Sequence, residues 1–412
     1  MQTSFIRKIL YKIIIIFLLC FLLQAHSHAV PQYILEDLGG TIAYGINESG
    51  QVVGFSIGQA VLWDNGSTTI LGPGYARDIN ESGQVVGSSN EKGVLWENGS
   101  INDLGTTGVD ASPATAINNQ THVVGFQHTS STDGSSPYHA WLWDSANGLQ
   151  DIDTTGESYA LDINDNEIVV GRFGSPAHYP AIWQNGVMTP LSTSEGQAQG
   201  INNLNQVVGA EGPSSKYHAF LWEDGSMTDL GTIGTANSDA KAINKYGQVV
   251  GQLTFPGGVE YAMFWQDSEM FDLNDLISSD SDFVLTNAFD INNKGQIVGV
   301  GTINGERHAF LLTPIPEDTD GDGIPDDEDA CPFSDLNDTV EIDGCDSGVE
   351  NVLLEDGCTI SDLIWQCAED AKNHGEFVSA VSHTTNSLKK EGIISGKDKG
   401  KIQKGAAKAD IP

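Results

Sequence analysis

The sequence predicts an all-β fold: a seven-bladed β-propeller closed by its own N-terminal strand, followed by a small disulfide-bonded module and a short α-helical C-terminal tail. Three observations predict it. A nine-residue string recurs seven times, a strand-like string follows each copy, and the chain combines 47 Gly and 8 Trp with only 18% charged residues. Such a composition is typical of short strands joined by tight turns.

The first 29 residues are expected to be a secretory signal peptide. Basic residues at Arg7, Lys8 and Lys12 precede the apolar run from Ile13 to Leu23, and small residues at Ser27 and Ala29 suit a cut before Val30. A membrane anchor is the rival interpretation, but the run is about half of the ~20 residues that a span requires. We therefore expect a secreted, extracellular protein and leave the periplasm and the bacterial cell surface open.

The charge of the chain limits its partners. Acidic residues number 56 against 19 basic ones, so the formal net charge is -37, and removal of the leader takes it to -40. A protein of this sign gains nothing from counterion release, so nucleic acids and anionic membranes are poor partners. Cations suit it better. Alternatively, the acidic surface reflects only a saline habitat.

The internal repeat is the strongest signal in the sequence. The string INESGQVVG starts at Ile46 and again at Ile79, and its variants start at Ile117, Ile163, Ile201, Ile243 and Ile291. The spacing averages about 41 residues, which is typical of propeller blades.

Each repeat predicts four short strands. Strand a ends in strings such as ARDIN, b is QVVG, c is HAFLW and d is MTDLG. Polar turns such as NESG and DNGS join a to b and c to d, which favours hairpins. Four strands in such a meander form one blade.

The two ends of the array predict how the ring closes. The seventh c strand, which begins at His308, runs directly into TPIPEDTD and has no d strand after it. A spare d-like string, YILEDLGG, begins at Tyr33. We therefore predict that the N-terminal strand completes the last blade, so that residues 30–313 form a closed ring. A β-sandwich does not explain seven equal copies.

Residues that repeat at one strand position are poor candidates for catalysis. The histidines at this position are His139, His218 and His308, and the tryptophans are Trp63, Trp96, Trp143, Trp183, Trp222 and Trp265. Repeated positions lie far apart around a ring, whereas an active site needs convergence. We interpret the tryptophans as blade packing, and the Asp-Ile-Asn strings, as at Asp78, as turns only. No catalytic residue is predicted.

Loop lengths indicate a ligand-binding face. The b–c connections vary in length whereas the a–b turns do not, and in a meander blade the b–c and d–a loops emerge on one face. Our candidate contacts in or beside the b–c loops are Tyr138, Arg172, His178, Tyr179, Lys216, Tyr217, Tyr261 and Arg307.

The string DTDGDGIPDDEDACP predicts a calcium loop. Carboxylates fall at positions 1, 3, 5, 9 and 12 and a carbonyl at position 7; these ligands are Asp318, Asp320, Asp322, Asp326, Asp329 and Ile324. Asp instead of Glu at position 12, and Pro325 inside the loop, differ from an EF-hand. An acidic flexible linker is the alternative.

Four cysteines follow the array, at Cys331, Cys345, Cys358 and Cys367. In an oxidising compartment they are expected to form two disulfides; zinc is the rival, but no C-x-x-C pair is present. Three pairings are open, and the simplest is Cys331–Cys345 with Cys358–Cys367. Residues 347–412 show helical spacing and, from Lys372 on, eight Lys against four acidic residues. This basic end either docks on an acidic partner or is a solvated helical module.

Two stretches resemble known families. The HAFLW…MTDLG and IN-x-x-GQVVG strings of residues 33–313 resemble the HAF repeat of bacterial extracellular proteins, and DTDGDGIPDDEDACP with Cys345 resembles a bacterial thrombospondin type 3 repeat. The first resemblance implies a secreted propeller-like array without an assigned reaction. The second implies that Ca²⁺ and a disulfide stiffen residues 314–346 into a spacer.

These observations favour a secreted, calcium-binding, non-catalytic binding or scaffold protein. Its variable loops are expected to recognise an extracellular protein or polysaccharide. The alternative is a polysaccharide lyase or glycosidase with its active site in the central funnel. Such an enzyme needs unrepeated acidic and basic residues that converge from several loops, and the sequence contains only scattered ones.

Overall fold

The computed structural model describes residues 32–410 except 107–111, 129–137, 154–155, 175–176, 214–215, 280, 317 and 327. The predicted signal peptide lies outside the described residues. The described chain forms two compact units, Gln32–Pro314 and the segment from Ile315 on. Within the described part of the chain, the helices are too short or too polar to cross a membrane.

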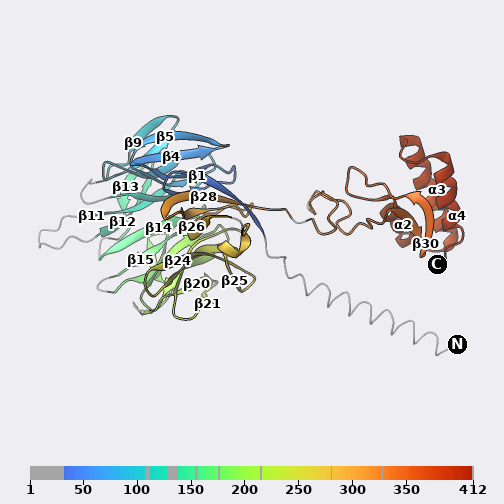
Figure 1. The fold of residues 1–412 in the computed structure, drawn as a ribbon. Coiled ribbons are helices and arrows are strands. Elements are labelled where there is room, and N and C mark those ends of the chain that lie inside the picture. The colour runs from blue at the N-terminus through green and yellow to red at the C-terminus, as the bar shows by residue number, and fades with distance from the viewer. Residues whose placement is uncertain are drawn as a thin grey trace, which may run out of the picture. The chain divides into compact units, whose positions relative to one another are not determined.

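The first unit is a seven-bladed propeller, as predicted, with seven four-stranded antiparallel sheets among its described residues (Figure 1). Blade 1 comprises β2 (Ile42–Ile46), β3 (Val52–Ser56), β4 (Gln59–Asp64) and β5 (Ser67–Pro73). Blade 2 comprises β6 (Tyr75–Ile79), β7 (Val85–Ser89), β8 (Lys92–Glu97) and β9 (Ser100–Asp103). Blade 3 comprises β10 (Ala114–Ile117), β11 (Val123–His128), β12 (Tyr138–Asp144) and β13 (Gly148–Asp151).

The next three blades repeat the same order. Blade 4 comprises β14 (Ser158–Ile163), β15 (Val169–Phe173), β16 (Tyr179–Gln184) and β17 (Val187–Pro190). Blade 5 comprises β18 (Gly196–Ile201), β19 (Val207–Glu211), β20 (His218–Glu223) and β21 (Ser226–Gly231). Blade 6 comprises β22 (Asn237–Ile243), β23 (Val249–Phe255), β24 (Val259–Gln266) and β25 (Glu269–Asp272), and the short 3₁₀ helix η1 (Leu273–Leu276) follows it.

Blade 7 confirms the predicted closure. It comprises β26 (Phe283–Ile291), β27 (Ile297–Ile303), β28 (Glu306–Pro314) and, as its outermost strand, β1 (Tyr33–Gly39). Strand β1 pairs antiparallel with β28, so Tyr33 lies opposite Pro314 and Asp37 opposite Phe310. The first strand of the unit thus hydrogen-bonds to the last, and β28 has no open edge.

Seven apolar layers hold the blades together, one between each pair of neighbours. Each buried cluster mixes side chains from two blades: Val53 of blade 1, for example, packs with Ala76 and Trp96 of blade 2. The layer between the last and first blades joins Val298 to Trp63 in the same way. The repeated tryptophans therefore lie within or against these layers, which agrees with a packing role.

One asparagine per repeat also connects the blades. The seven are Asn47, Asn80, Asn118, Asn164, Asn202, Asn244 and Asn292, and all are at least 94% buried. Each Nδ2 donates to the backbone carbonyl of the corresponding asparagine in the next blade at 3.0–3.2 Å, and Asn292 closes the circle onto Asn47. Each Oδ1 accepts the N–H groups two and four residues further on, as Asn47 does from Ser49 and Gln51. We call this set the asparagine ring.

The histidines of the HAF strings pair with aspartates of the outermost strands. His218 Nδ1 lies 2.8 Å from Asp229 Oδ2, and the equivalent distances are 3.0 Å for His308 and Asp37 and 3.5 Å for His139 and Asp151. These pairs cross-link strands c and d of three separate blades. Their spacing around the ring supports the structural interpretation of the repeated histidines.

Three aspartates join the innermost strands of neighbouring blades. Asp78, Asp162 and Asp290 each accept the N–H of the following residue and the N–H of an isoleucine in the next blade, as Asp162 does from Ile201 at 2.8 Å. Burial raises the pKa of Asp162 to about 7 and that of Asp290 to about 6, and it raises the pKa of Asp78 well above its usual value.

The second unit is a small α+β module. A hairpin of β29 (Thr339–Ile342) and β30 (Cys345–Glu350) packs on α2 (Ile360–Glu369), α3 (His374–Glu391) and α4 (Gly396–Ala406). Thr359 with Asp362, and Ser395 with Asp398, form capping boxes that start α2 and α4. Gly392, with φ 84°, ends α3 in the left-handed conformation.

The predicted boundary between a spacer, residues 314–346, and a helical module, residues 347–412, is wrong. The hairpin of β29 and β30 crosses that boundary, and Val340, Ile342 and Val349 are buried in the same core as Ile360 and Ile402. The segment from Ile315 on therefore folds as one unit, because the hairpin supplies part of the apolar surface that covers the helices.

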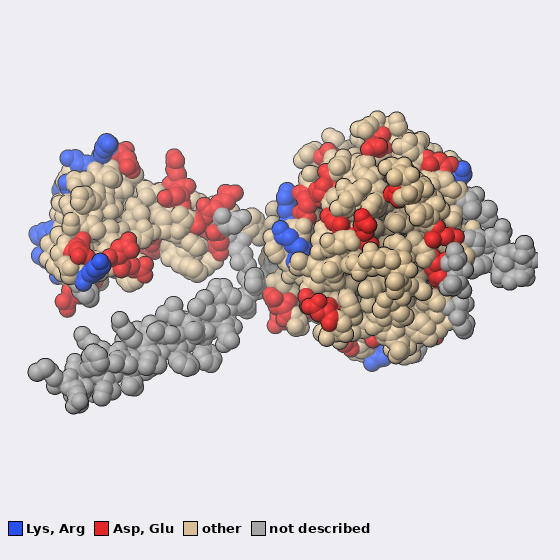
Figure 2. Space-filling view, turned by 180° about the vertical axis from the view of Figure 1, so that it is seen from behind, with Lys and Arg blue, Asp and Glu red and all other residues tan. Residues whose placement is uncertain are grey.

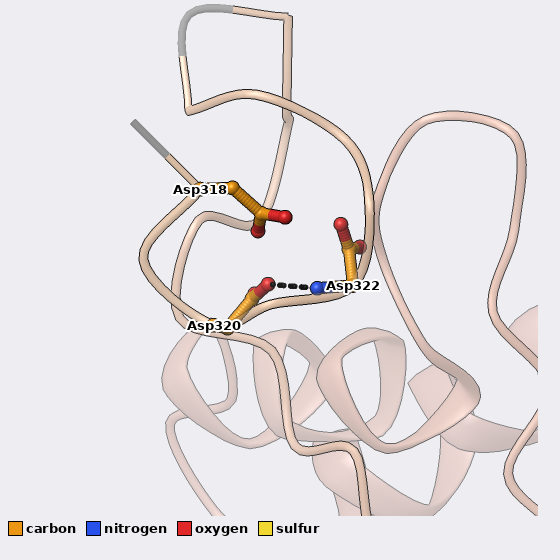
Figure 3. Close-up of side chains that lie close together, drawn as sticks. All are labelled: Asp318, Asp320 and Asp322. Atoms are coloured by element: carbon orange, nitrogen blue, oxygen red, sulfur yellow. Dashed lines mark hydrogen bonds between the residues drawn. The ribbon is translucent and has the colours of Figure 1, made fainter. Parts of the chain in front are cut away.

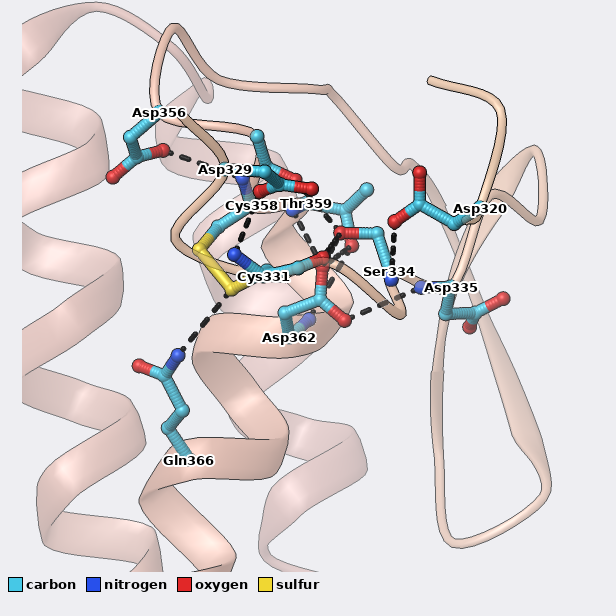
Figure 4. Close-up of a disulfide and its surroundings, with 11 residues drawn as sticks. Asp320, Asp329, Cys331, Ser334, Asp335, Asp356, Cys358, Thr359, Asp362 and Gln366 are labelled. Carbon is cyan, nitrogen blue, oxygen red and sulfur yellow. Dashed lines mark hydrogen bonds between the residues drawn. A yellow bond between two sulfur atoms is a disulfide. The ribbon is translucent and has the colours of Figure 1, made fainter. Parts of the chain in front are cut away.

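The predicted disulfide pairs, Cys331–Cys345 and Cys358–Cys367, are also wrong. The structure joins Cys331 to Cys358 (Figure 4), with their Cα atoms 4.9 Å apart. Ala330 donates its N–H to the carbonyl of Asp356 at 2.9 Å, so these two segments run side by side. Cys345 instead lies exposed in the hairpin, and Cys367 is a buried thiol in α2.

Candidate functional site

A pocket opens between blades 4, 5 and 6. Its volume is about 420 Å³, within the range of small-molecule sites. The lining residues lie at the ends of b strands, the starts of a strands and the loops beside them: Arg172, Ala177, His178, Glu195, Gly196, Gln197, Ala210, Tyr217, Asn237, Ser238, Asp239, Gln252 and Thr254. These positions belong to the face on which the sequence predicts the variable loops. We call this cavity the variable-face pocket.

The structure brings together three of the eight predicted contacts, since Arg172, His178 and Tyr217 all line the variable-face pocket. A fourth, Tyr138, does not line the pocket, but its ring lies near that of Tyr159, which contacts Arg172. The other four do not line it: Tyr179, Lys216, Tyr261 and Arg307. Of these, Tyr261 packs edge-on against Phe255 at 5.8 Å between ring centroids.

Tyr159, which the sequence analysis missed, connects the predicted residues. Its ring centroid lies 5.2 Å from that of Tyr138, 4.8 Å from that of Phe126 and 6.1 Å from that of His178. The guanidinium carbon of Arg172 lies 3.9 Å from the centroid of the Tyr159 ring. These side chains form an aromatic row along blades 3 and 4 that leads to the pocket.

Glu157 fixes the polar ends of this row. It accepts a hydrogen bond of 2.7 Å from the hydroxyl of Tyr159, and its other oxygen lies 3.6 Å from Nε2 of His178. Burial and the nearby Glu157 raise the pKa of Tyr159 to about 12. Tyr159 therefore stays neutral, and it contacts Arg172 through its ring face and through a side-chain hydrogen bond.

Hydrogen bonds between blades 5 and 6 set the floor of the pocket. Asn237 Oδ1 accepts the N–H of Tyr217 at 3.1 Å. Ser238, which is fully buried, accepts the N–H of Ala219 at 2.8 Å. Asp239 is paired with Lys241 at 2.6 Å, which offsets its charge. The floor is thus fixed by contacts within the propeller before any ligand binds.

The aspartate loop is a second candidate site. Asp318, Asp320 and Asp322 each offer a carboxylate oxygen, and these oxygens lie within 4.8 Å of one another (Figure 3). The N–H groups of Gly321 and Gly323 donate to Asp318 at 2.8 and 3.0 Å and hold the turn. Oxygen ligands of this kind suit Ca²⁺.

The remaining predicted ligands lie outside this cluster. Asp326 accepts hydrogen bonds from the N–H and Oγ1 of Thr319 at 2.7 and 2.5 Å, and Asp329 accepts the N–H of Cys331 at 2.7 Å. Ile324 donates its N–H to Asp322 at 2.7 Å. Within the described residues, Oδ2 of Asp322, a member of the cluster, is buried without a hydrogen-bond partner, which fits a cation there. Oδ2 of Asp329, outside the cluster, is buried without a partner as well.

Hydrogen bonds connect the aspartate loop to the start of α2. Asp320 Oδ2 accepts the N–H of Ser334 at 2.6 Å, and Ser334 Oγ lies 2.8 Å from Asp362 Oδ2 (Figure 4). Asp362 also accepts the N–H of Thr359 at 2.6 Å as part of the capping box of α2. The loop is therefore built into the module and is not a separate spacer.

Comparisons by sequence find no matching family model and no matching curated protein. Among solved structures, the β-propeller domain of the Trilobed protease from Pyrococcus furiosus is 13% identical, with 56% of this chain and 79% of that chain covered and a TM-score of 0.41. The acylaminoacyl peptidase of Pyrococcus horikoshii is 12% identical, with coverages of 70% and 52% and a TM-score of 0.45. Dipeptidyl peptidase 4 of Porphyromonas gingivalis is 10% identical, with coverages of 69% and 53% and a TM-score of 0.36.

The chain thus spans about half the length of the last two peptidases. At these identities the likeness concerns the fold alone.

Proposed function

We propose that this protein is a secreted, non-catalytic binding or scaffold protein whose propeller holds an extracellular ligand in the variable-face pocket. One observation carries the proposal: residues from three blades line a single pocket with a fixed floor. Three of them, Arg172, His178 and Tyr217, were predicted as ligand contacts from the variable length of the b–c loops. A ligand site on one face of a rigid ring is the usual way in which repeat arrays bind.

The disulfide of the second unit supports the proposed export to an oxidising compartment. The Cys331–Cys358 disulfide is of the kind that persists outside the cytosol. Figure 2 shows acidic side chains scattered over the visible face of the propeller and few basic ones, a surface that suits a ligand other than nucleic acid.

We also propose that Asp318, Asp320 and Asp322 hold one Ca²⁺ ion. The ion would supply positive charge between three carboxylates that otherwise repel one another. Because Asp320 also accepts the N–H of Ser334, a bound ion would stabilise the arrangement of the loop against α2.

The ligand-binding proposal is tested with the chain from Val30 on, applied to intact bacterial cells and to a panel of polysaccharides and extracellular proteins. We expect saturable binding that the Tyr217→Ala variant loses. The Tyr261→Ala variant, which removes a tyrosine outside the pocket, should bind normally. Equal binding by both variants would contradict the site. Slow release of reducing ends from a polysaccharide would contradict the non-catalytic role and favour the enzyme.

The metal proposal is tested by isothermal titration of the full chain with Ca²⁺. One site should be seen, and Asp320→Asn should weaken it at least about tenfold, because a ligand oxygen loses its charge. Asp338→Asn changes an exposed aspartate outside the loop and should have no effect. Absence of a heat signal with intact protein would contradict the proposal.

A further inference from the structure

We infer that the variable-face pocket takes an acidic saccharide, with a sugar carboxylate paired to Arg172. The inference rests on the proposed ligand-binding function and adds the chemical class of the ligand. The observation behind it is the positive charge of Arg172, which no described residue neutralises in an ion pair.

Arg172 makes no ion pair with the described residues, although the chain has 56 acidic residues against 19 basic ones. Two other cations of the propeller are paired, Lys241 with Asp239 at 2.6 Å and Lys92 with Asp103 at 2.5 Å. The remaining ones also form no ion pair with described residues, but they do not line the pocket: Arg77, Lys216, Lys245, Lys294 and Arg307. Arg172 lies instead over the neutral ring of Tyr159 and faces the pocket. A cation held in this way is available to a single carboxylate, whereas the acidic surface around it, including Glu195 at the pocket, disfavours a dense polyanion such as nucleic acid.

The stacked geometry favours a carboxylate. A guanidinium that lies on an aromatic face keeps the N–H groups of its edge for hydrogen bonds, and a carboxylate can accept two of them in parallel. Because Tyr159 is itself held by Glu157, the guanidinium is positioned before the ligand arrives. Less side-chain freedom is then lost on binding.

The rest of the lining suits a sugar better than a peptide. Gln197, Gln252 and Thr254 offer amide and hydroxyl groups, which can donate to and accept from ring hydroxyls. The only aliphatic side chains among the described lining residues are Ala177 and Ala210, which give a peptide side chain little to pack against. The aromatic row beside the pocket adds apolar ring surface that a sugar can contact, although its rings are tilted or edge-on to one another.

The test uses the full chain from Val30 and short oligomers of galacturonate, of glucuronate, and of mannuronate with guluronate. Each is paired with its carboxyl-reduced counterpart, in which the same rings carry no charge. Isothermal titration should detect at least one of the acidic oligomers, and the reduced counterpart should bind at least about tenfold more weakly, the factor that corresponds to one charge-assisted contact of about 1.4 kcal/mol.

Variants of Arg172 test whether this residue causes the preference for the acidic oligomer. Arg172→Ala should lose the preference for the acidic oligomer, and Arg172→Lys should recover only part of it, because an ammonium group cannot form two parallel hydrogen bonds with one carboxylate. Arg307→Ala removes an arginine outside the pocket and should bind as the native chain does. Thermal unfolding of each variant shows that the blades are intact.

Two outcomes would overturn the inference: equal binding of the acidic and reduced oligomers, or no binding of any acidic oligomer. If neutral sugars or proteins still bind in a manner that depends on Tyr217, the proposed binding function stands and only the ligand class is wrong. If nothing in either panel depends on Tyr217, the proposed function itself fails.

Discussion

At the scale of single residues, the asparagine ring joins each blade to the next through one buried side chain. Each asparagine side chain satisfies two N–H groups of its own turn and a carbonyl of the next blade. Removal of one side chain leaves several buried backbone groups without partners. Each such group costs about 1–3 kcal/mol.

We therefore expect Asn118→Ala to lower the free energy of unfolding by at least about 2 kcal/mol, measured by urea denaturation. Gln120, two residues further along the same turn, is exposed, and Gln120→Ala should change the stability by less than about 0.5 kcal/mol. Similar losses in both variants would show that the turn, and not the ring, is responsible.

The buried aspartates make the stability of the propeller depend on pH. The pKa of Asp162 is raised to about 7 in the folded chain, whereas an unfolded carboxyl titrates near 4. Between these values the folded state binds more protons, so stability should rise as the pH falls from about 7 towards about 4. Other carboxylates titrate as well, so a variant is needed to isolate this group.

Asp162→Asn removes the titrating group. The difference in stability between the native chain and this variant, measured by urea denaturation at several pH values, should shift in favour of the native chain as the pH falls from 7.5 to 5. Asp224→Asn, a change at an exposed aspartate in a turn of blade 5, serves as the control. Parallel pH profiles for the native chain and Asp162→Asn would rule out the effect.

At the scale of elements, the disulfide closes a loop that joins the aspartate loop to α2. Cys331 and Cys358 are 27 residues apart, and cross-linking a loop of this length stabilises by about 3–4 kcal/mol in the chain-entropy model. We expect the Cys331→Ser, Cys358→Ser double variant to lower the stability of the second unit by an amount of this order. Peptide mapping of the native chain should recover the Cys331–Cys358 pair.

The thiols supply a further check on this pairing. In the unreduced chain, Cys345 should react with a thiol reagent and the buried Cys367 should react only after unfolding. Recovery of a Cys331–Cys345 peptide would contradict the structure.

At the scale of elements, some features were predictable from the sequence and others were not. The blades and the closure through Tyr33 were predictable, because repeated spacing and turn residues are local signals. The disulfide was not, because the chain path that lays Ala330 beside Asp356 depends on tertiary contacts. The hairpin of β29 and β30 was missed because its two short strands straddle the predicted boundary between the spacer and the helical module.

In the candidate site, too, some residues were predictable from the sequence and others were not. Arg172, His178 and Tyr217 were found because variation in b–c loop length marks one face. Tyr159 and Asp239 lie near the start of β14 and β22, the a strands of blades 4 and 6. The length of the b–c loops therefore gives no indication of their role. The clustering of Asp318, Asp320 and Asp322 was predictable from their spacing, whereas the side-chain position of Asp326 depends on its bonds to Thr319.

At the scale of the whole molecule, the ring of the propeller depends on β1. Deletion of residues 30–39 should leave the edge of β28 unpaired and remove Tyr33 from the apolar layer beside Phe264. We expect the truncated chain to aggregate or to unfold at a lower temperature, as size-exclusion chromatography and thermal unfolding would measure. Ile34→Ser, a change at an exposed position of the same strand, is the control. A monomeric truncated chain with unchanged thermal stability would show that β1 is dispensable.

The pairing of Tyr33 with Pro314 also has a kinetic consequence. Contacts between residues this far apart in the chain form late and slow folding, since a long loop must close before they can stabilise anything. Strand β1 is the first strand of the propeller to be synthesised, yet its partner β28 is the last. The native ring can therefore assemble only once the entire array is available, and a chain interrupted at any blade keeps an open edge.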